Sequence, residues 1–204
     1  MKNKLIIVHG ATALSSKNKI IQKIISNIYK YIFNYIPEYN KINPWINKFS
    51  KSEFEIIEFK WDGKIIPYDI PKASQKLSEI LKLSQNQNIF FLTESIGTEI
   101  TLSAIQKLEF KDNIKKIVSI CPVNKPRTIN DFSMTILNSK SDTFANFANK
   151  FLWPSKMFKK LNGDIENIKL ENIRHDQFLP NFKINNKETL LNLIKNKFNE
   201  YEYE

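Results

Sequence analysis

The sequence predicts an α/β protein: a three-layer α/β/α sandwich around a mostly parallel sheet of about six strands. Short runs rich in Ile, Val and Phe alternate along the 204-residue chain with segments whose apolar residues recur at helical spacing. Strands that alternate with helices are joined by right-handed crossovers, which give a parallel sheet covered on both faces. No internal repeat, low-complexity tract or linker divides the chain, so residues 1–204 are expected to form a single domain.

Six apolar runs bounded by turn residues are the predicted strands. Their ranges are 5–8, 54–59, 89–92, 114–123, 133–138 and 165–173. Apolar residues spaced three or four apart predict the helices. These cover 21–32, 71–81, 96–109, 143–153 and 187–198. Pro71 suits the first turn of its helix, whereas Pro37 and Pro154 end theirs.

The net charge of +10 would suit an anionic partner such as nucleic acid or acidic lipid. Yet only Arg127 and Arg174 are arginines among the 31 basic residues, and the lysines are dispersed along the chain with many Asn and Ile. Guanidinium is the better group for recognising phosphates and bases. The charge therefore indicates a nucleotide bias in the genome, and no specific nucleic-acid partner is expected.

Cys121, the one cysteine, lies in an apolar run and is predicted to be a buried thiol. Lys2 and Lys4 precede an apolar run of four residues, which is shorter than the roughly 7–15 residues of a signal-peptide core. No span approaches the ~20 apolar residues of a membrane helix. These features predict a cytoplasmic protein without a transmembrane segment, and they leave the oligomeric state open.

Polar residues follow four predicted strands, at the edge where reactive groups gather in parallel sheets. His9 and Gly10 follow the first strand, Ser95 the third, Asp142 the fifth and His175 the sixth. A serine nucleophile needs a base to take its proton, and the base needs a carboxylate to fix its tautomer. Ser95, Asp142 and His175 are therefore a candidate catalytic triad.

The candidate nucleophile lies in the segment Thr-Glu-Ser-Ile-Gly at 93–97, between a buried strand and a helical pattern that begins at once. A strand–serine–helix corner presents the hydroxyl at the carboxyl edge of the sheet. The first free amides of the helix then lie beside it.

These segments make the chain resemble the α/β-hydrolase superfamily, in a small form without a separate cap domain. The resemblance rests on 5–10, 93–97, 172–176 and the strand that leads to Asp142, and it covers nearly the whole chain. Phe-Lys-Trp-Asp-Gly at 59–63 is also similar to the Phe-x-Trp-x-Gly of lipase and esterase branches. Because the chain starts at the equivalent of the family's third strand, the resemblance implies a six-stranded sheet in the order 2-1-3-4-5-6.

The resemblance also implies a role for each matching residue. Ser95 would be the nucleophile, His175 the general base and Asp142 the acid that orients the base. The backbone N–H groups of Ile96 and Ala11 would form the oxyanion hole. Ser95 Oγ should then lie within hydrogen-bond reach of His175.

His9, Gly10 and Gly97 would support the site, His9 by tying its own loop through hydrogen bonds. The family pattern is Gly-x-Ser-x-Gly, whereas position 93 of this chain is threonine. Glycine is favoured there because the strained turn brings backbone and neighbouring strands close together. Thr93 fits only if its neighbours give way, which predicts a slightly opened elbow.

Asp142 has carboxylate rivals. Asp131 and Asp164 lie on the approaches to strands, at the opposite edge of the sheet. Asp176 directly follows the candidate base and is expected to face away or to cap the next segment. Glu94 would either contact the base or be exposed or locally paired. No Cys/His cluster or carboxylate set has the spacing of metal ligands and the glycines form no phosphate loop, so neither a metal nor a cofactor is expected.

The sequence thus predicts a serine hydrolase of the esterase, lipase or thioesterase kind, which cleaves a carboxylic ester or thioester through an acyl-enzyme. Aromatic residues within 29–45 and 144–158 are either an acyl pocket or core, and 37–49 is either a plain loop or a flap over that pocket. Two other classes stay open. One is an inactive α/β-hydrolase-like binding protein, which Thr93 favours, and the other is a lysine-rich protein that docks on anionic membrane or RNA.

Overall fold

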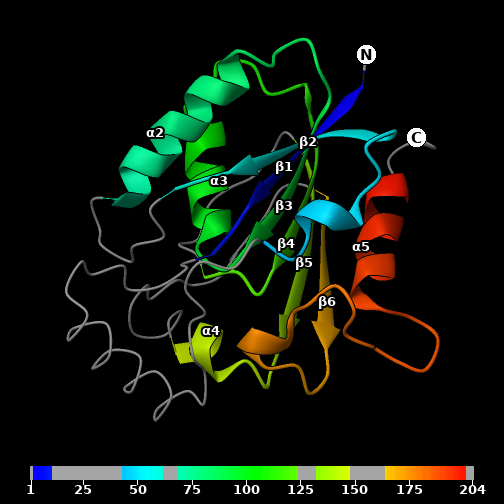
Figure 1. The fold of residues 1–204 in the computed structure, drawn as a ribbon. Helices are drawn as coiled ribbons and strands as arrows, with labels where there is room; N and C mark the ends of the chain where they lie inside the picture. Colours follow the sequence, from blue (N-terminus) through cyan, green and yellow to red (C-terminus); the bar gives the residue numbers. More distant parts are fainter. Residues whose placement is uncertain (1, 11–42, 62–68, 124–131, 148–163, 201–204) are drawn as a thin grey trace.

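Six parallel strands form one sheet in the part of the chain that the structure describes (Figure 1). They are β1 Asn3–Val8, β2 Phe54–Phe59, β3 Ile89–Glu94, β4 Ile114–Ile120, β5 Ser133–Ser139 and β6 Ile165–Leu170. Their spatial order is β2-β1-β3-β4-β5-β6, with every neighbouring pair parallel. The predicted fold class and strand order are both confirmed.

A computed structural model describes residues 2–10, 43–61, 69–123, 132–147 and 164–200. The predicted helix 21–32, the loop residues 37–42, the segment 148–153 and Ala11 lie outside these residues. Within the described ranges, no helix has the length and apolar character needed to cross a bilayer.

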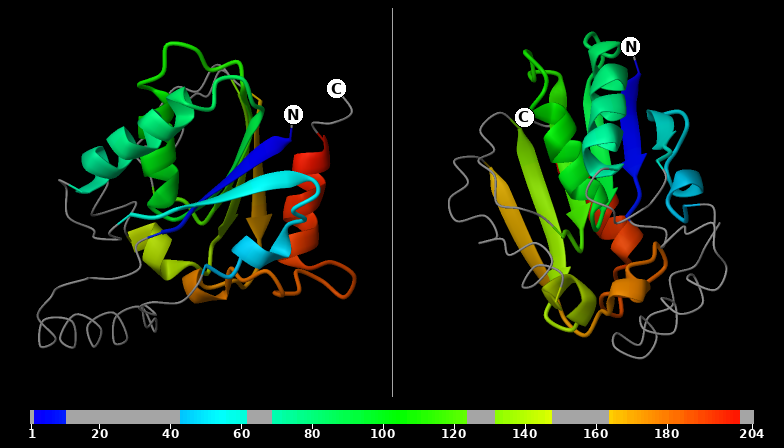
Figure 2. Two further views of the ribbon diagram at one scale, coloured as in Figure 1. Left: turned by 45° about the horizontal axis from the view of Figure 1, so that its top comes forward. Right: turned by 90° about the vertical axis from the view of Figure 1, so that its left-hand side faces the viewer.

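Helices cover both faces of the sheet (Figure 2). The helices are α2 Asp69–Lys82, α3 Gly97–Ile105, α4 Thr143–Phe147 and α5 Leu190–Asn199, and short 3₁₀ turns are η1 Ile46–Lys48 and η3 His175–Gln177. Helices α2 and α3 pack side by side on one face, and α5 lies on the other (Figure 1). This arrangement is the three-layer sandwich that the alternation of strands and helices predicts.

Successive side chains of β1 alternate between two apolar cores. Ile6 and Val8 pack into the core shared with α2 and α3, whereas Leu5 and Ile7 pack into the core shared with α5. All four are fully buried. A central strand buried on both faces explains why this run is continuously apolar in the sequence.

Two strands end earlier than the sequence predicts, and each ends near a residue in the left-handed region. β4 ends at Ile120 because Cys121 turns to a φ of 41°. β6 ends at Leu170, and Asn172, with a φ of 57°, turns the chain soon afterwards. A left-handed residue cannot continue an extended strand, so the apolar runs outlast the strands themselves.

Candidate active site

Ser95 occupies a sharp turn between β3 and α3 at the carboxyl edge of the sheet. Its φ of 49° lies in the left-handed region that residues other than glycine rarely adopt. The Ser95 N–H donates to the carbonyl of Ile120 at 2.9 Å, and the Thr98 N–H donates to the carbonyl of Ser95 at 3.2 Å. A backbone strained in this way persists only where its surroundings fix it, and it is typical of functional sites.

Two glycines let the end of β1 approach this turn closely. A Cβ at Gly97 would lie 2.4 Å from the carbonyl oxygen of Val8 and 2.7 Å from that of His9. A Cβ at Gly10 would lie 2.9 Å from the Cβ of Ser95. These separations are shorter than van der Waals contact, so a side chain at either position would force neighbouring atoms to move.

Thr93 fits beside the turn because small hydroxyl residues surround it. Its side chain is fully buried, and its Oγ1 lies 2.8 Å from Oγ1 of Thr98, which in turn lies 2.6 Å from Oγ of Ser119. Ser119 also lies opposite Thr93 in the register of β3 and β4. The chain of hydroxyls satisfies a polar group that would otherwise be buried without a partner. The turn beside Thr93 keeps the left-handed conformation at Ser95.

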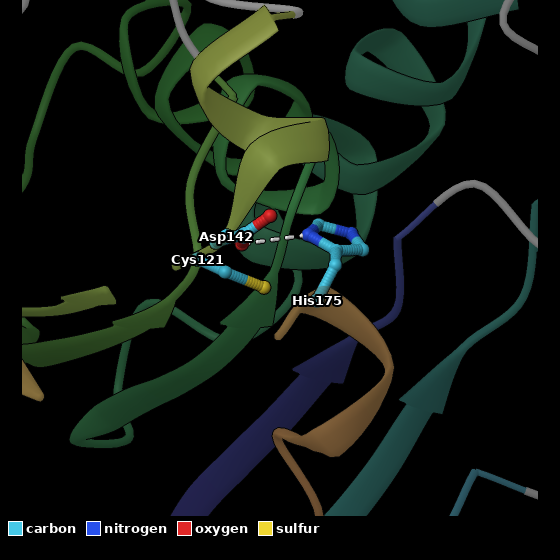
Figure 3. A group of neighbouring side chains, drawn as sticks. All are labelled: Cys121, Asp142 and His175. Carbon is cyan, nitrogen blue, oxygen red and sulfur yellow. Dashed lines mark hydrogen bonds and ion pairs between the residues drawn. The ribbon is translucent and has the colours of Figure 1, made fainter. Parts of the chain in front are cut away.

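His175 and Asp142 form a hydrogen-bonded pair in which Asp142 is buried and His175 is partly buried (Figure 3). The Nδ1 atom of His175 lies 2.8 Å from Oδ2 of Asp142, and their side chains are 11% and 1% exposed. Asp142 directly precedes α4, and its Oδ1 accepts a hydrogen bond from the Ala145 N–H at 2.9 Å, as an N-cap residue does. The ring of Phe144 packs on the imidazole, with centroids 4.6 Å apart. Both carboxylate oxygens are therefore engaged, and the imidazole is fixed on two sides.

Ser139 links the two loops that carry this pair. Its Oγ accepts a hydrogen bond from the Ser141 N–H at 3.1 Å and another from the Ile173 N–H at 3.3 Å. Ser141 precedes Asp142, and Ile173 lies two residues before His175. One buried hydroxyl thus ties together the chain segments that follow β5 and β6.

His9 holds the loop after β1. Its Nδ1–H donates to the carbonyl of Gly10 at 2.7 Å, and its ring stacks on Trp61 with centroids 5.6 Å apart. The Trp61 Nε1–H donates to the carbonyl of His9 at 3.1 Å. Burial lowers the pKa of His9, which favours the neutral ring. These contacts hold the chain directly after β1 against Trp61, which lies beyond the end of β2.

Glu94, directly before Ser95, is a partly buried carboxyl paired with a residue far away in the sequence. Its Oε1 accepts a hydrogen bond from Nε1–H of Trp45 at 2.6 Å, and Trp45 is fully buried. Burial raises the pKa of Glu94 from its ordinary value of 4.5 to about 7, although the Trp45 hydrogen bond and the charge of His175 act in the opposite direction. The local sequence suggests an exposed or locally paired side chain and does not reveal Trp45.

The raised pKa of Glu94 predicts that stability falls as pH rises from about 4.5 to about 7. In that window the native state keeps a proton that the unfolded state has lost. Glu94→Gln cannot ionise and keeps an acceptor for Trp45. We therefore expect the variant to gain up to about 3 kcal/mol of unfolding free energy over the wild type between pH 4 and pH 8, an upper limit because Glu94 keeps some contact with solvent. Urea unfolding at both pH values measures this difference, and Glu79→Gln on exposed α2 surface, which should show no such change, is the control.

The remaining predicted residues are distributed as follows. Ile96 is buried and directly precedes α3, whereas Ala11 and the rival Asp131 lie outside the described residues. The rival Asp164 lies at the amino edge of the sheet, where its Oδ2 accepts a hydrogen bond from the Ser133 hydroxyl at 3.3 Å. The contact between Ser95 Oγ and the His175 ring stays a prediction.

Cys121 is the neighbour of this site that the sequence does not indicate. It is buried and free, as predicted, but its sulfur, a ring nitrogen of His175 and a carboxylate oxygen of Asp142 all lie within 4.8 Å of one another. Burial raises the pKa of the thiol well above its usual range, with the carboxylates of Asp142 and Glu94 adding to the effect and the Ser95 N–H opposing it. The three potential metal ligands are far apart in the sequence, so no spacing rule detects them.

Neither a protein-family model nor a curated protein sequence matches the chain. Solved structures do. The chain is similar to an alpha/beta hydrolase enzyme from the metagenome of sediments of the Mar Chica lagoon, Morocco, with a TM-score of 0.54, 12% identity and coverage of 99% of this chain and 93% of that one. It is also similar to an uncharacterized protein from Bacillus cereus, with a TM-score of 0.54, 14% identity and coverage of 99% of this chain and 61% of that one. For a dienelactone hydrolase from Anabaena variabilis the TM-score is 0.51 and the identity 12%, and the match covers 98% of this chain and 87% of that one. At such identities the likeness establishes the fold alone.

Proposed function

We propose that this chain, which has the α/β-hydrolase fold, is a serine hydrolase that cleaves a carboxylic ester or thioester. The observation that carries the proposal is the partly buried pair of His175 and Asp142, joined by a hydrogen bond of 2.8 Å. It lies at the sheet edge where Ser95 adopts a strained φ of 49°. A histidine fixed by a carboxylate and a serine on a strained strand-to-helix turn are the parts that acyl transfer requires.

In the proposed reaction Ser95 Oγ attacks the acyl carbonyl while Nε2 of His175 takes the hydroxyl proton. Asp142 holds the proton on Nδ1, which leaves Nε2 free as the base and stabilises the imidazolium that forms. His175 then gives the proton to the departing alcohol or thiol. Water repeats the sequence on the acyl-enzyme and releases the carboxylic acid.

The oxyanion of each tetrahedral intermediate would be stabilised by backbone N–H groups of Ile96 and Ala11. The close backbone approach at Gly10 and Gly97, where an added Cβ would meet its neighbours at less than 3 Å, supports this assignment, because it places the end of β1 against the turn that carries Ser95. Donors fixed in advance cost no reorganisation during the reaction, and one such donor is worth about 2.7–4 kcal/mol in related chemistry.

An apolar acyl group would suit the surroundings of the pair. Phe144 packs on the His175 ring at 4.6 Å, and Trp45 is fully buried next to Glu94. Apolar walls of this kind exclude water and strengthen the electrostatic interactions of the triad. Esters and thioesters share the same acyl chemistry and differ in the leaving group.

A fluorophosphonate probe tests the proposal directly, because it forms a covalent bond with an activated serine. We expect stoichiometric labelling of the wild type at Ser95, located by mass spectrometry of the digest. Ser95→Ala should abolish labelling. The exposed Ser52→Ala should leave it unchanged and is the matched control.

Folding of each variant is checked by circular dichroism and thermal unfolding. Absence of labelling in folded wild-type protein would contradict the serine hydrolase and favour an inactive binding protein. Labelling that survives Ser95→Ala would place the nucleophile elsewhere. Salt-sensitive retention on heparin or on anionic vesicles, without labelling, would favour a protein that docks on anionic surfaces.

A further inference from the structure

We propose that Cys121, Asp142 and His175 form a binding site for a thiophilic divalent cation of the Zn²⁺ class, and that occupation of this site switches the hydrolase off. Cation binding depends only on these three residues. The effect on activity rests on the proposed function.

The three ligand types meet at the carboxyl ends of three neighbouring strands. Cys121 directly follows β4, Asp142 follows β5 and His175 follows β6. A sulfur, a carboxylate oxygen and a ring nitrogen lie within 4.8 Å of one another, and Figure 3 shows the sulfur and the carboxylate pointing toward the imidazole. Ligands on a single tetrahedral zinc lie about 3.3–3.5 Å apart, so side-chain shifts of about 1 Å would close the site.

The backbone around each ligand is fixed. The Cys121 N–H donates to the carbonyl of Leu137 at 2.7 Å, and the Ala145 N–H donates to Oδ1 of Asp142 at 2.9 Å. The segment that leads to His175 is tied to Ser139 through Ile173. A site whose ligands are held in advance loses little conformational entropy on binding.

The donor set selects the kind of cation. Thiolate and imidazole suit Zn²⁺ and similar metals, whereas Mg²⁺ and Ca²⁺ require several oxygen ligands and would find only Asp142 among these three. Thiolate and carboxylate together carry two negative charges, which balance a divalent cation at a buried position. Three protein ligands leave a fourth position for water or for a substrate atom.

Without a bound cation, the pair of His175 and Asp142 has the arrangement that the proposed reaction needs. Nδ1 of His175 lies 2.8 Å from Oδ2 of Asp142, so the carboxylate holds the proton on Nδ1 and leaves Nε2 free as the base. Metal binding would release the thiol proton to solvent and form the metal–sulfur bond. A metal on Nδ1 would move the proton of the neutral imidazole to Nε2, through solvent. Because Nε2 then carries a proton, it cannot accept one from Ser95.

Titration of the whole chain with Co²⁺ and Zn²⁺ tests binding without reference to activity. We expect a sulfur-to-cobalt charge-transfer absorption in the wild type that Zn²⁺ displaces and that Cys121→Ser abolishes. Competition with a chromogenic chelator should show zinc affinity reduced more than about 100-fold in Cys121→Ala, which exceeds the ~10–100-fold cost of losing a partner outside the coordination shell. Calorimetry in two buffers should show a proton released for each Zn²⁺ bound.

Two results would overturn the site: no binding at sub-millimolar free Zn²⁺, or equal affinity in wild type and both Cys121 variants. Thermal unfolding confirms that each variant is folded.

The effect of the cation on activity is measured as the ratio of fluorophosphonate labelling rates with and without Zn²⁺. This ratio should fall in the wild type and stay near unity in Cys121→Ala. An equal fall in both would overturn regulation through this site. If chelator-treated wild type is not labelled at all, the proposed function fails while the cobalt spectra still decide the binding site.

Discussion

Asp142→Asn should lower kcat for an activated ester by about four orders of magnitude. Oδ2 of Asp142 lies 2.8 Å from Nδ1 of His175, so the carboxylate holds the proton on Nδ1 and leaves Nε2 free to act as the base. An amide nitrogen at that position would donate toward Nδ1 and would favour the tautomer with its proton on Nε2. Steady-state hydrolysis of a nitrophenyl ester, with a chelator present, measures kcat and KM.

The substitution is conservative for the fold. Asparagine is as good an N-cap as aspartate, so its carbonyl should still accept the Ala145 N–H that Oδ1 accepts now. Asp164→Asn, at the opposite edge of the sheet, is the matched control and should leave kcat unchanged. His175→Ala should lose at least as much activity as Asp142→Asn, because it removes the base itself. A loss smaller than tenfold in folded Asp142→Asn would contradict the assigned role.

The placement of this pair could be predicted from sequence because it follows from topology. Parallel strands end at a common edge, so residues directly after β5 and β6 come together once the strand order is known. The apolar runs identified the strands, and Asp142 and His175 follow two of them. The helical segments were predicted less accurately at their ends, where α3 ends at Ile105 rather than at residue 109.

Contacts that depend on side-chain packing could not be predicted in the same way. Trp45 reaches Glu94 across 49 residues of sequence, and nothing local to either residue encodes that hydrogen bond. The hydroxyls around Thr93 come from α3 and β4, so the sequence shows the departure from glycine but not the groups that accommodate it. The sequence pattern places Cys121 in the continuation of an apolar strand. In the structure its left-handed φ ends the strand and turns the residue toward the site.

Gly97→Ala should destabilise the protein by more than about 4 kcal/mol or prevent folding. Helix propensity alone would predict the opposite sign, since alanine is favoured over glycine in helices by about 1 kcal/mol and Gly97 is the first residue of α3. The packing overrules propensity here because the new Cβ would lie 2.4 Å from the carbonyl oxygen of Val8, a backbone atom in a central strand. Urea unfolding followed by circular dichroism measures the change.

Ser103→Ala on the same helix is the control and should change the unfolding free energy by less than about 1 kcal/mol. A Gly97→Ala variant as stable as the wild type would show that β1 and α3 do not approach each other this closely.

Gly10→Ala separates stability from activity at the same contact. Its Cβ would meet the Cβ of Ser95 at 2.9 Å and the carbonyl oxygen of Glu94 at 3.3 Å, so the strain falls on the turn rather than on the central strand. We expect a smaller loss of unfolding free energy than in Gly97→Ala but a large fall in the rate of fluorophosphonate labelling, because displacement of a reacting atom by about 1 Å costs about 100-fold in rate. The two glycines thus act on different properties of one interface: Gly97 allows the strand and helix to pack, and Gly10 allows Ser95 to keep its position.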